Sequence, residues 1–378
     1  MTQTPKSLLL GVGMAAYLEC DAVLSLREFH PSAQAGFQLA ITQEDGVVTS
    51  ADMRIGFMHR GFEKLFESRD YRQLMMLANR YDWFSAFSSE LAIALVLESA
   101  SGIVPPERAT WTRMLLAEAN RVTTTLAFLA AVLDDRPQEL AAKARERLIT
   151  AQELATGGRV HPMFTRIGGV AAPVSEDALA AYAEEVTALE DSLTEIGDGT
   201  RAYASGLSGL AVLSHDDAIG FGTSGAVARA SGLDLDLRRD DPYLAYSDIT
   251  DLLAVPSRTS GDARARYEVL VEQLPSGLAI MRASIDRLRD LGPGAIDVPL
   301  PKTVRAPEGT TYGWIEGPLG ISGALLVSLG DSMPCRLKLR SASFANAQAM
   351  QVALVGTPYD RLADAVMSFF LSVGDIDR

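Results

Sequence analysis

Residues 115–133, LLAEANRVTTTLAFLAAVL, decide the fold class of this chain. Their apolar side chains recur at steps of three and four residues, which is the spacing of one face of an α-helix. The positions are Leu115, Ala119, Val122, Leu126, Leu129 and Leu133. A long helix with one apolar face has to bury that face against other helices, so the stretch predicts a helical bundle.

Two further stretches show the same helical period. Residues 179–196 carry a second series, and the acidic residues beside it mark a solvated face. Residues 267–288 carry a third, in which Pro275 predicts a kink because proline lacks the backbone N–H of a helix interior. The two series are Leu179, Tyr182, Val186, Leu189, Leu193, Ile196 and Tyr267, Leu270, Leu274, Leu278, Met281, Ile285, Leu288.

Shorter β segments are expected on both sides of the bundle. Residues 37–42 alternate apolar and polar side chains before the turn sequence 44–46, which is typical of a hairpin. Residues 312–315, 323–328 and 335–339 read as further strands. The predicted fold is therefore α+β and mainly α, with an N-terminal β region (1–54), a helical bundle (55–300), and a C-terminal β region with a closing helix (301–378).

Composition and charge exclude several classes of function. The 378 residues include 34 Lys and Arg but 48 Asp and Glu, a net charge of −14, which disfavours binding to nucleic acid. Two cysteines, Cys20 and Cys335, can form neither a disulfide framework nor a tetrahedral metal site alone. The apolar stretch 8–16 after Lys6 reads either as a secretory segment or as a buried first strand, and we favour the strand. We expect a cytoplasmic protein.

Two clusters of charge combined with glycine or aromatic residues stand out. The first comprises residues 55–64 with 69–71, 80–83 and Glu90, and the second comprises residues 157–169, where glycines flank two arginines and a histidine. Charges among aromatic residues or in a tightly bent loop need partners or a charged ligand. An internal network of ion pairs is the other reading of each cluster, and on physical grounds alone we favour it.

The sequence of these clusters resembles the 49 kDa, or D, subunit of respiratory complex I. The resemblance rests on residues 55–71 and 159–169 and on the C-terminal stretch 336–344, RLKLRSASF. Weaker matches lie in the same order between them, from His30-Pro31-Ser32 to the final residues 374–378. Several separated motifs in order are more specific than any single one.

This resemblance implies a fold like that of the nickel–iron hydrogenase large subunit and a place in the peripheral arm of the complex. A subunit of this kind binds no metal or redox cofactor itself. It packs against a small iron–sulfur subunit and forms at that interface the cavity where quinone receives electrons. His161 would hydrogen-bond near the partner's cluster, with His59, Arg60 and Arg80 in the same cationic neighbourhood. Such groups stabilise an anionic reduced cluster.

The chain departs from the family pattern at the quinone positions. Gln34 stands where a proton-donating histidine is expected, and an amide has no transferable proton near neutral pH. Trp83 replaces the tyrosine expected on the other side of the headgroup, whereas Asp135 matches the acidic partner of the lost histidine. The two Cys-x-x-Cys motifs of the hydrogenases have no counterpart, so nickel–iron chemistry is disfavoured.

Two functions therefore remain. The first is a D-type subunit of a proton-translocating NADH-quinone oxidoreductase, contacting other peripheral and membrane subunits on the cytoplasmic side of the inner membrane. The alternative is a structural paralogue that keeps the partner interface and has lost quinone chemistry. The sequence alone does not choose between them.

Overall fold

The computed structural model describes residues 5–378, so the first four residues of the predicted N-terminal β region lie outside the described residues. The elements of that region form a sheet of order β2-β1-β3-β4. β1 pairs antiparallel with β3, and β3 with β4, so the hairpin predicted from alternation is confirmed. The apolar stretch after Lys6 is a central strand of this sheet. The strands are β1 (Lys6–Gly13), β2 (Ala22–Val23), β3 (Gly36–Glu44) and β4 (Val47–Arg54).

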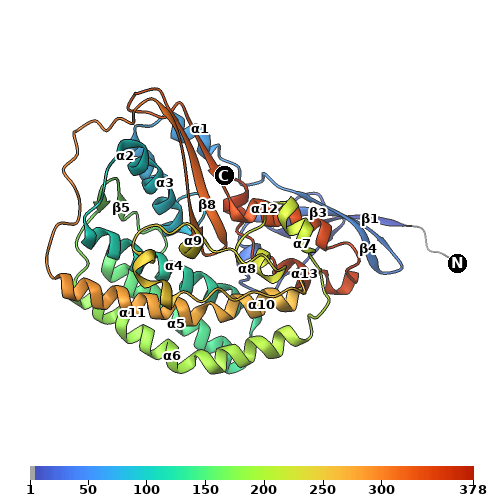
Figure 1. Ribbon diagram of the computed structural model, residues 1–378. Helices are drawn as coiled ribbons and strands as arrows, with labels where there is room; N and C mark the ends of the chain where they lie inside the picture. The colour runs from blue at the N-terminus through green and yellow to red at the C-terminus, as the bar shows by residue number, and fades with distance from the viewer. Residues whose placement is uncertain (1–4) are drawn as a thin grey trace.

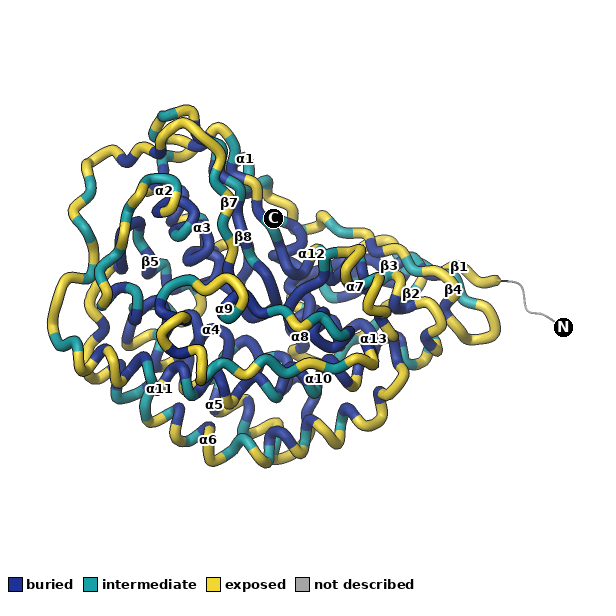
Figure 2. Tube along the Cα trace, in the orientation of Figure 1, coloured by how far each residue is buried: buried dark blue, intermediate teal, exposed yellow. Residues whose placement is uncertain are grey.

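The predicted helical bundle forms the largest part of the fold (Figure 1). α4 packs against both α5 and α11, and α6 covers α5, α10 and α11. Along α5 and α6 the exposed positions lie on the outside and the buried ones face the bundle, as Figure 2 shows. The bundle helices are α3 (Ala86–Ser101), α4 (Glu107–Val132), α5 (Asp135–Thr156), α6 (Glu176–Ser205), α10 (Ala263–Glu272) and α11 (Leu274–Leu291).

The stretch 115–133 lies in α4 as predicted. The expected single apolar face is wrong, however, because this helix is buried on its polar positions as well. Its polar residues Arg113, Glu118 and Arg121 are buried as fully as its leucines. Within the described residues, only α4 is long and apolar enough to cross a membrane, and 89% of its most apolar window is buried inside the protein. Every residue from Trp111 to Val122 is buried, so α4 is the central helix of the core, although Ala127 and Ala130 further along are partly exposed.

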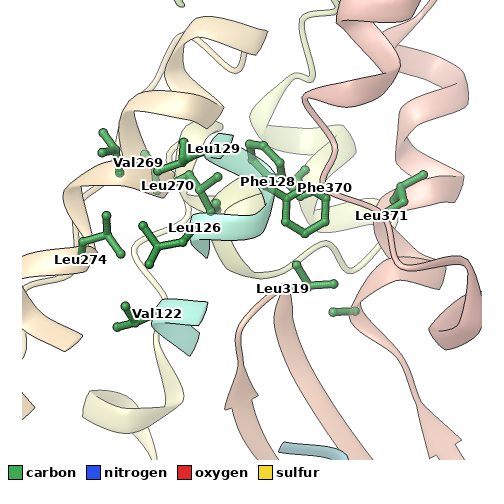
Figure 3. Close-up of a cluster of buried hydrophobic side chains, with 14 of the residues drawn as sticks. Val122, Leu126, Phe128, Leu129, Val269, Leu270, Leu274, Leu319, Phe370 and Leu371 are labelled. Atoms are coloured by element: carbon green, nitrogen blue, oxygen red, sulfur yellow. The ribbon is translucent and has the colours of Figure 1, made fainter. Parts of the chain in front are cut away.

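The apolar core joins the bundle to the C-terminal chain around α4 (Figure 3). Leu126 and Leu129 gather with Leu270 and other side chains of α10 and α11 on one side of the helix. Phe128 points to the other side, where its ring centroid lies 5.4 Å from that of Phe370. The core therefore ties segments that are more than 240 residues apart in the sequence.

The C-terminal region forms a three-stranded sheet of order β7-β8-β9, followed by short helices. The sheet packs on α3, and α12 packs on β4 of the N-terminal sheet. Whether the three predicted regions are separate domains stays a prediction. The elements are β7 (Gly309–Gly317), β8 (Gly320–Ser328), β9 (Arg336–Arg340), α12 (Ala342–Ala353), α13 (Leu362–Met367) and α14 (Val373–Ile376).

Small elements complete the fold and refine several predictions. Pro275 separates two helices rather than kinking one, because proline fits the first turn of a helix. The predicted closing helix is present as two short helices, α13 and α14. The remaining elements are α1 (Phe62–Glu67), α2 (Tyr71–Met75), β5 (Thr165–Arg166), β6 (Gly169–Val170), α7 (His215–Gly220), α8 (Gly225–Ala230), α9 (Leu237–Asp240) and the 3₁₀ turns Met14–Tyr17, Pro31–Ala33, Tyr246–Leu252 and Tyr359–Arg361.

A buried network of six charges joins α4 to α8, α9 and β7. Arg238 contacts Glu118 at 3.1 Å and Asp236 at 2.7 Å. Burial raises the pKa of the Glu118 carboxyl, but Arg121 and Arg238 outweigh it and leave the pKa below its ordinary value. The three cations and three anions balance, which makes their burial tolerable. The members are Glu118, Arg121, Arg229, Asp236, Arg238 and Glu316.

The central position of α4 makes its leucines sensitive to truncation. We expect Leu126→Ala to lower the free energy of unfolding by about 2–5 kcal/mol, because Leu126 is fully buried and its loss leaves a cavity. Leu154→Ala is the matched control on α5, where the side chain is 56% exposed, and should change it by less than about 0.5 kcal/mol. Urea unfolding measures both, and equal effects would contradict the central role of α4.

Candidate functional site

The loop of residues 55–61 is held by the far C-terminus of the chain. The Asp377 carboxylate accepts hydrogen bonds from the backbone N–H groups of Gly56 and Met58, both at 2.8 Å. His59 Nδ1 lies 3.1 Å from the Asp377 carbonyl oxygen. These contacts fix His59 and Arg60 at the surface, although they lie more than 300 residues before Asp377.

Arg60 and Arg80 are held together by groups that carry no charge. Arg60 donates a hydrogen bond to the Arg80 carbonyl at 2.9 Å, and its guanidinium lies 4.6 Å from the centre of the Phe62 ring. Arg80 reaches the sulfur of Met163 at 3.2 Å. Both side chains are exposed, and neither has an ion-pair partner among residues 5–378. Their positive charges are therefore available to a further group.

His161 lies half-buried beside these arginines. Burial lowers the pKa of its imidazole, and the charges of Arg80 and Arg60 lower it further, against a hydrogen bond with the Asn79 backbone. The ring is therefore neutral at pH 7 in the isolated chain. The structure thus brings Arg60, Arg80 and His161 together, with His59 next to Arg60 in the sequence.

The bent loop 157–164 that carries His161 is fixed from α5. Gln152 donates its amide to the carbonyl oxygens of Gly158 and Arg159, at 3.0 and 2.8 Å. A side chain at Gly158 would lie 2.6 Å from the His161 carbonyl oxygen, so only glycine fits there. Arg159 pairs with Glu146 and Glu153, so for this residue the predicted internal network of ion pairs is confirmed.

A buried carboxyl group supports the same loop from below. Glu90 on α3 accepts from the Phe164 backbone N–H at 3.3 Å and from the Asn79 amide at 3.5 Å. Burial raises the pKa of Glu90 to about 8, because its hydrogen bonds and the charge of Arg166 offset only part of the desolvation. Glu90 stood within the first charged cluster of the sequence, but its contact with the second cluster was not predicted.

Two adjoining hollows lie between α4, α5 and the chain around Gln34. The larger, here the Gln34 hollow, has a volume of about 600 Å³, and the smaller, the Trp83 hollow, about 40 Å³. Phe84, Ala127 and Arg145 line both, and Arg159 and Val160 line the Trp83 hollow. The larger volume lies in the range of small-molecule sites.

The structure places two of the three predicted quinone positions on these hollows. Gln34 is exposed on the wall of the first, and Trp83 lines the second. The indole packs on Gly374, where a Cβ would lie 2.3 Å from the ring, so this glycine fixes its place. Asp135 is exposed at the start of α5 and lines neither hollow, whereas its neighbour Asp134 pairs with Arg27 at 2.8 Å.

The raised pKa of Glu90 predicts a pH effect on stability. The folded chain keeps a proton that the unfolded chain releases above about pH 4.5, so the wild type loses stability as pH rises from about 4.5 to 8. Glu90→Gln removes this pH dependence. Its free energy of unfolding should therefore rise relative to that of the wild type by up to about 1.4 kcal/mol for each pH unit in this range. Thermal unfolding from about pH 5 to 8 measures it, with the exposed Glu184→Gln as control. A pH-independent difference would contradict it.

Comparison with known proteins gives the family. Residues 137–303 and 296–378 match the family described as "Respiratory-chain NADH dehydrogenase, 49 Kd subunit". The chain is 44% identical to the first NADH-quinone oxidoreductase D subunit of Streptomyces coelicolor, over 100% of both chains. It is also 44% identical to the second such D subunit of Streptomyces griseus, over 100% of this chain and 96% of that one. Identity to the NADH-quinone oxidoreductase D subunit of Clostridium beijerinckii is 28%, over 95% of this chain and 97% of that one. The chain therefore belongs to the 49 kDa subunit family of the respiratory-chain NADH dehydrogenases.

Proposed function

We propose that the chain works in the peripheral arm of a complex I-type NADH-quinone oxidoreductase and forms, with a small iron–sulfur subunit, the site where quinone receives electrons. Its family and the names of its relatives support a component of an oxidoreductase complex. The electron carrier belongs to the partner, so the isolated chain has no activity of its own. Other peripheral subunits and the membrane subunits are further partners, and the complex lies on the cytoplasmic side of the inner membrane.

The unneutralised cations carry this proposal. Arg60 and Arg80 are exposed, held by a carbonyl, an aromatic ring and a thioether, beside the half-buried His161. A reduced iron–sulfur cluster adds negative charge, and cations across an interface stabilise it. In a chain of net charge −14, two exposed arginines without an ion-pair partner among residues 5–378 suit such a neighbour.

Apolar side chains beside the cations support a protein partner at this edge. Phe57 is 42% exposed and lies two residues before His59, and Val160 is 54% exposed and directly precedes His161. Aromatic residues and arginines are enriched at protein interfaces, and the buried centre of an interface is more apolar than its rim. The partner that brings the cluster would cover both.

The hollows supply room for the quinone substrate near this edge. Arg159 and Val160 line the Trp83 hollow and directly precede His161 in the sequence. The Gln34 amide can donate a hydrogen bond to a carbonyl oxygen but transfers no proton at neutral pH. Protons for a reduced quinone must therefore come from another group or from water.

The alternative function is a structural paralogue without quinone chemistry. Gln34 and the indole of Trp83 favour it, because the first lacks a transferable proton and the second occupies space beside the headgroup position. A likeness to the fold of nickel–iron hydrogenases stays a prediction, and we do not propose nickel–iron chemistry for this chain.

Quinone reduction by the assembled complex separates the two functions. The chain is co-purified with its iron–sulfur partner and the upstream subunits, and the cluster is followed by electron paramagnetic resonance with and without a short-chain quinone. A quinone-dependent change in the cluster signal, together with quinone reduction, supports the first function. A complex that assembles with an intact cluster but shows neither would support the paralogue.

We predict that His161→Ala weakens the pH dependence of the partner cluster's midpoint potential. The imidazole is neutral in the isolated chain, and an anionic reduced cluster beside it would favour proton uptake, so reduction and protonation are coupled in the wild type. His215→Ala is the control, because that histidine lies at the start of α7 and contacts the Ser231 carbonyl. Redox titrations at several pH values measure the effect. A slope that is equal in His161→Ala and the wild type would overturn this role.

A further inference from the structure

Arg145 on α5 is, among the described residues, the one cation whose side chain lines both hollows. Its Nε is buried and has no hydrogen-bond partner within residues 5–378. Neighbouring charged groups on α5 are engaged elsewhere, since Glu146 pairs with Arg159 and Arg147 lies 3.6 Å from Glu185. Partial burial of a guanidinium without a counter-ion costs free energy unless a ligand supplies the missing hydrogen-bond acceptor.

The electrostatic surroundings of Arg145 leave its charge uncompensated. Burial lowers the pKa of its guanidinium, and Arg159 lowers it further, whereas only Glu146 raises it. Two other carboxylates line the Gln34 hollow, but neither pairs with Arg145. Glu139 pairs with Lys143 at 2.5 Å, and Glu28 forms no ion pair in the described part of the chain. An electron-rich oxygen in the hollow would therefore gain from a hydrogen bond with Arg145.

We propose that Arg145 binds an oxygen of the quinone headgroup, at the junction of the two hollows and between Gln34 and Trp83. The inference rests on the proposed function. Arg145 donates N–H hydrogen bonds and stabilises the negative charge that grows on the oxygen as electrons arrive, and it transfers no proton because a guanidinium stays protonated. Gln34 stands where a histidine is expected and makes a weaker polar contact with the headgroup. Arg145 thus supplies a second polar contact.

This position explains how one cavity can hold a headgroup with the proton donor replaced. The remaining lining of the Gln34 hollow is largely apolar, with Phe29, Phe84 and four alanines among its members. A few polar groups in an apolar hollow fix the orientation of a ligand. Glu28 and Glu139 also line the hollow but are carboxylates without a proton to donate when ionised, and Gln138 donates its amide to the Ala130 carbonyl. Gln34 and Arg145 are therefore the donors placed to do so, from the turn after His30 and from α5.

Substitution in the assembled complex tests the proposal. We expect Arg145→Gln to raise the KM for a short-chain quinone by about 10- to 100-fold, the effect of removing a hydrogen bond from a charged donor. Arg147→Gln is the matched control, because it lies two residues along α5 and is exposed. A KM that is unchanged in Arg145→Gln, or raised equally in the control, would overturn the proposal.

A second measurement needs no variant and no turnover. Phenylglyoxal labels exposed guanidinium groups of the wild-type complex, and mass spectrometry of its peptides follows Arg145 and Arg147 separately. Saturating quinone should slow the labelling of Arg145 at least about 5-fold, because about 80% occupancy leaves about one fifth of the sites free to react. The labelling rate of Arg147 should not change. Equal labelling of Arg145 with and without quinone overturns the role of Arg145. A wild-type complex that does not reduce quinone at all would instead overturn the proposed function.

Discussion

The side chains of Arg60 and Arg80 are held by neutral groups, and the rest of the site depends on this constraint. A carbonyl oxygen, an aromatic ring and a thioether orient the two guanidinium groups without cancelling their charge. A carboxylate in any of these places would form an internal ion pair and leave nothing for a partner. The positive edge therefore persists in an acidic chain and suits the proposed partner, whose cluster would gain negative charge on reduction.

By contrast, the buried arginines on and around α4 are paired with carboxylates. In the network around Glu118 every buried guanidinium has a carboxylate partner, and that network joins α4 to the C-terminal sheet. Arg113 likewise pairs with Glu98 at 2.6 Å and joins α4 to α3. These pairs hold the scaffold on which the loops of residues 55–61 and 157–164 stand. These paired arginines hold the core together, whereas Arg60 and Arg80 lie at the exposed edge without a carboxylate partner within the described residues and remain available to a neighbour.

The sequence predicted the elements whose signals are local. The period of three and four residues identified α6, and alternation with the turn at residues 44–46 identified the β3–β4 hairpin. The family resemblance singled out Arg60, Arg80 and His161, which the structure brings together. α12 was missed because its apolar residues are mostly alanines, although its Ser341 cap, which accepts from the Phe344 N–H at 3.1 Å, was a usable signal.

Contacts between distant segments could not be predicted from the residues alone. Nothing near Gly56 indicates that Asp377 accepts its backbone N–H, and nothing near Glu90 indicates that it supports the Phe164 loop. Arg145 lies in the sequence KARER, which reads as the solvated face of a helix. Only the packing of α5 against α4 reveals that this arginine lines a hollow and has an unpartnered nitrogen.

A structure of the chain bound to its iron–sulfur partner tests the central claim most directly. We expect the partner to cover Phe57 and Val160 and to place its terminal cluster beside Arg60, Arg80 and His161, with no carboxylate of either chain between them. A partner seated elsewhere, such as on the outer face of α6, would contradict this claim. So would a partner carboxylate that pairs with Arg60 or Arg80.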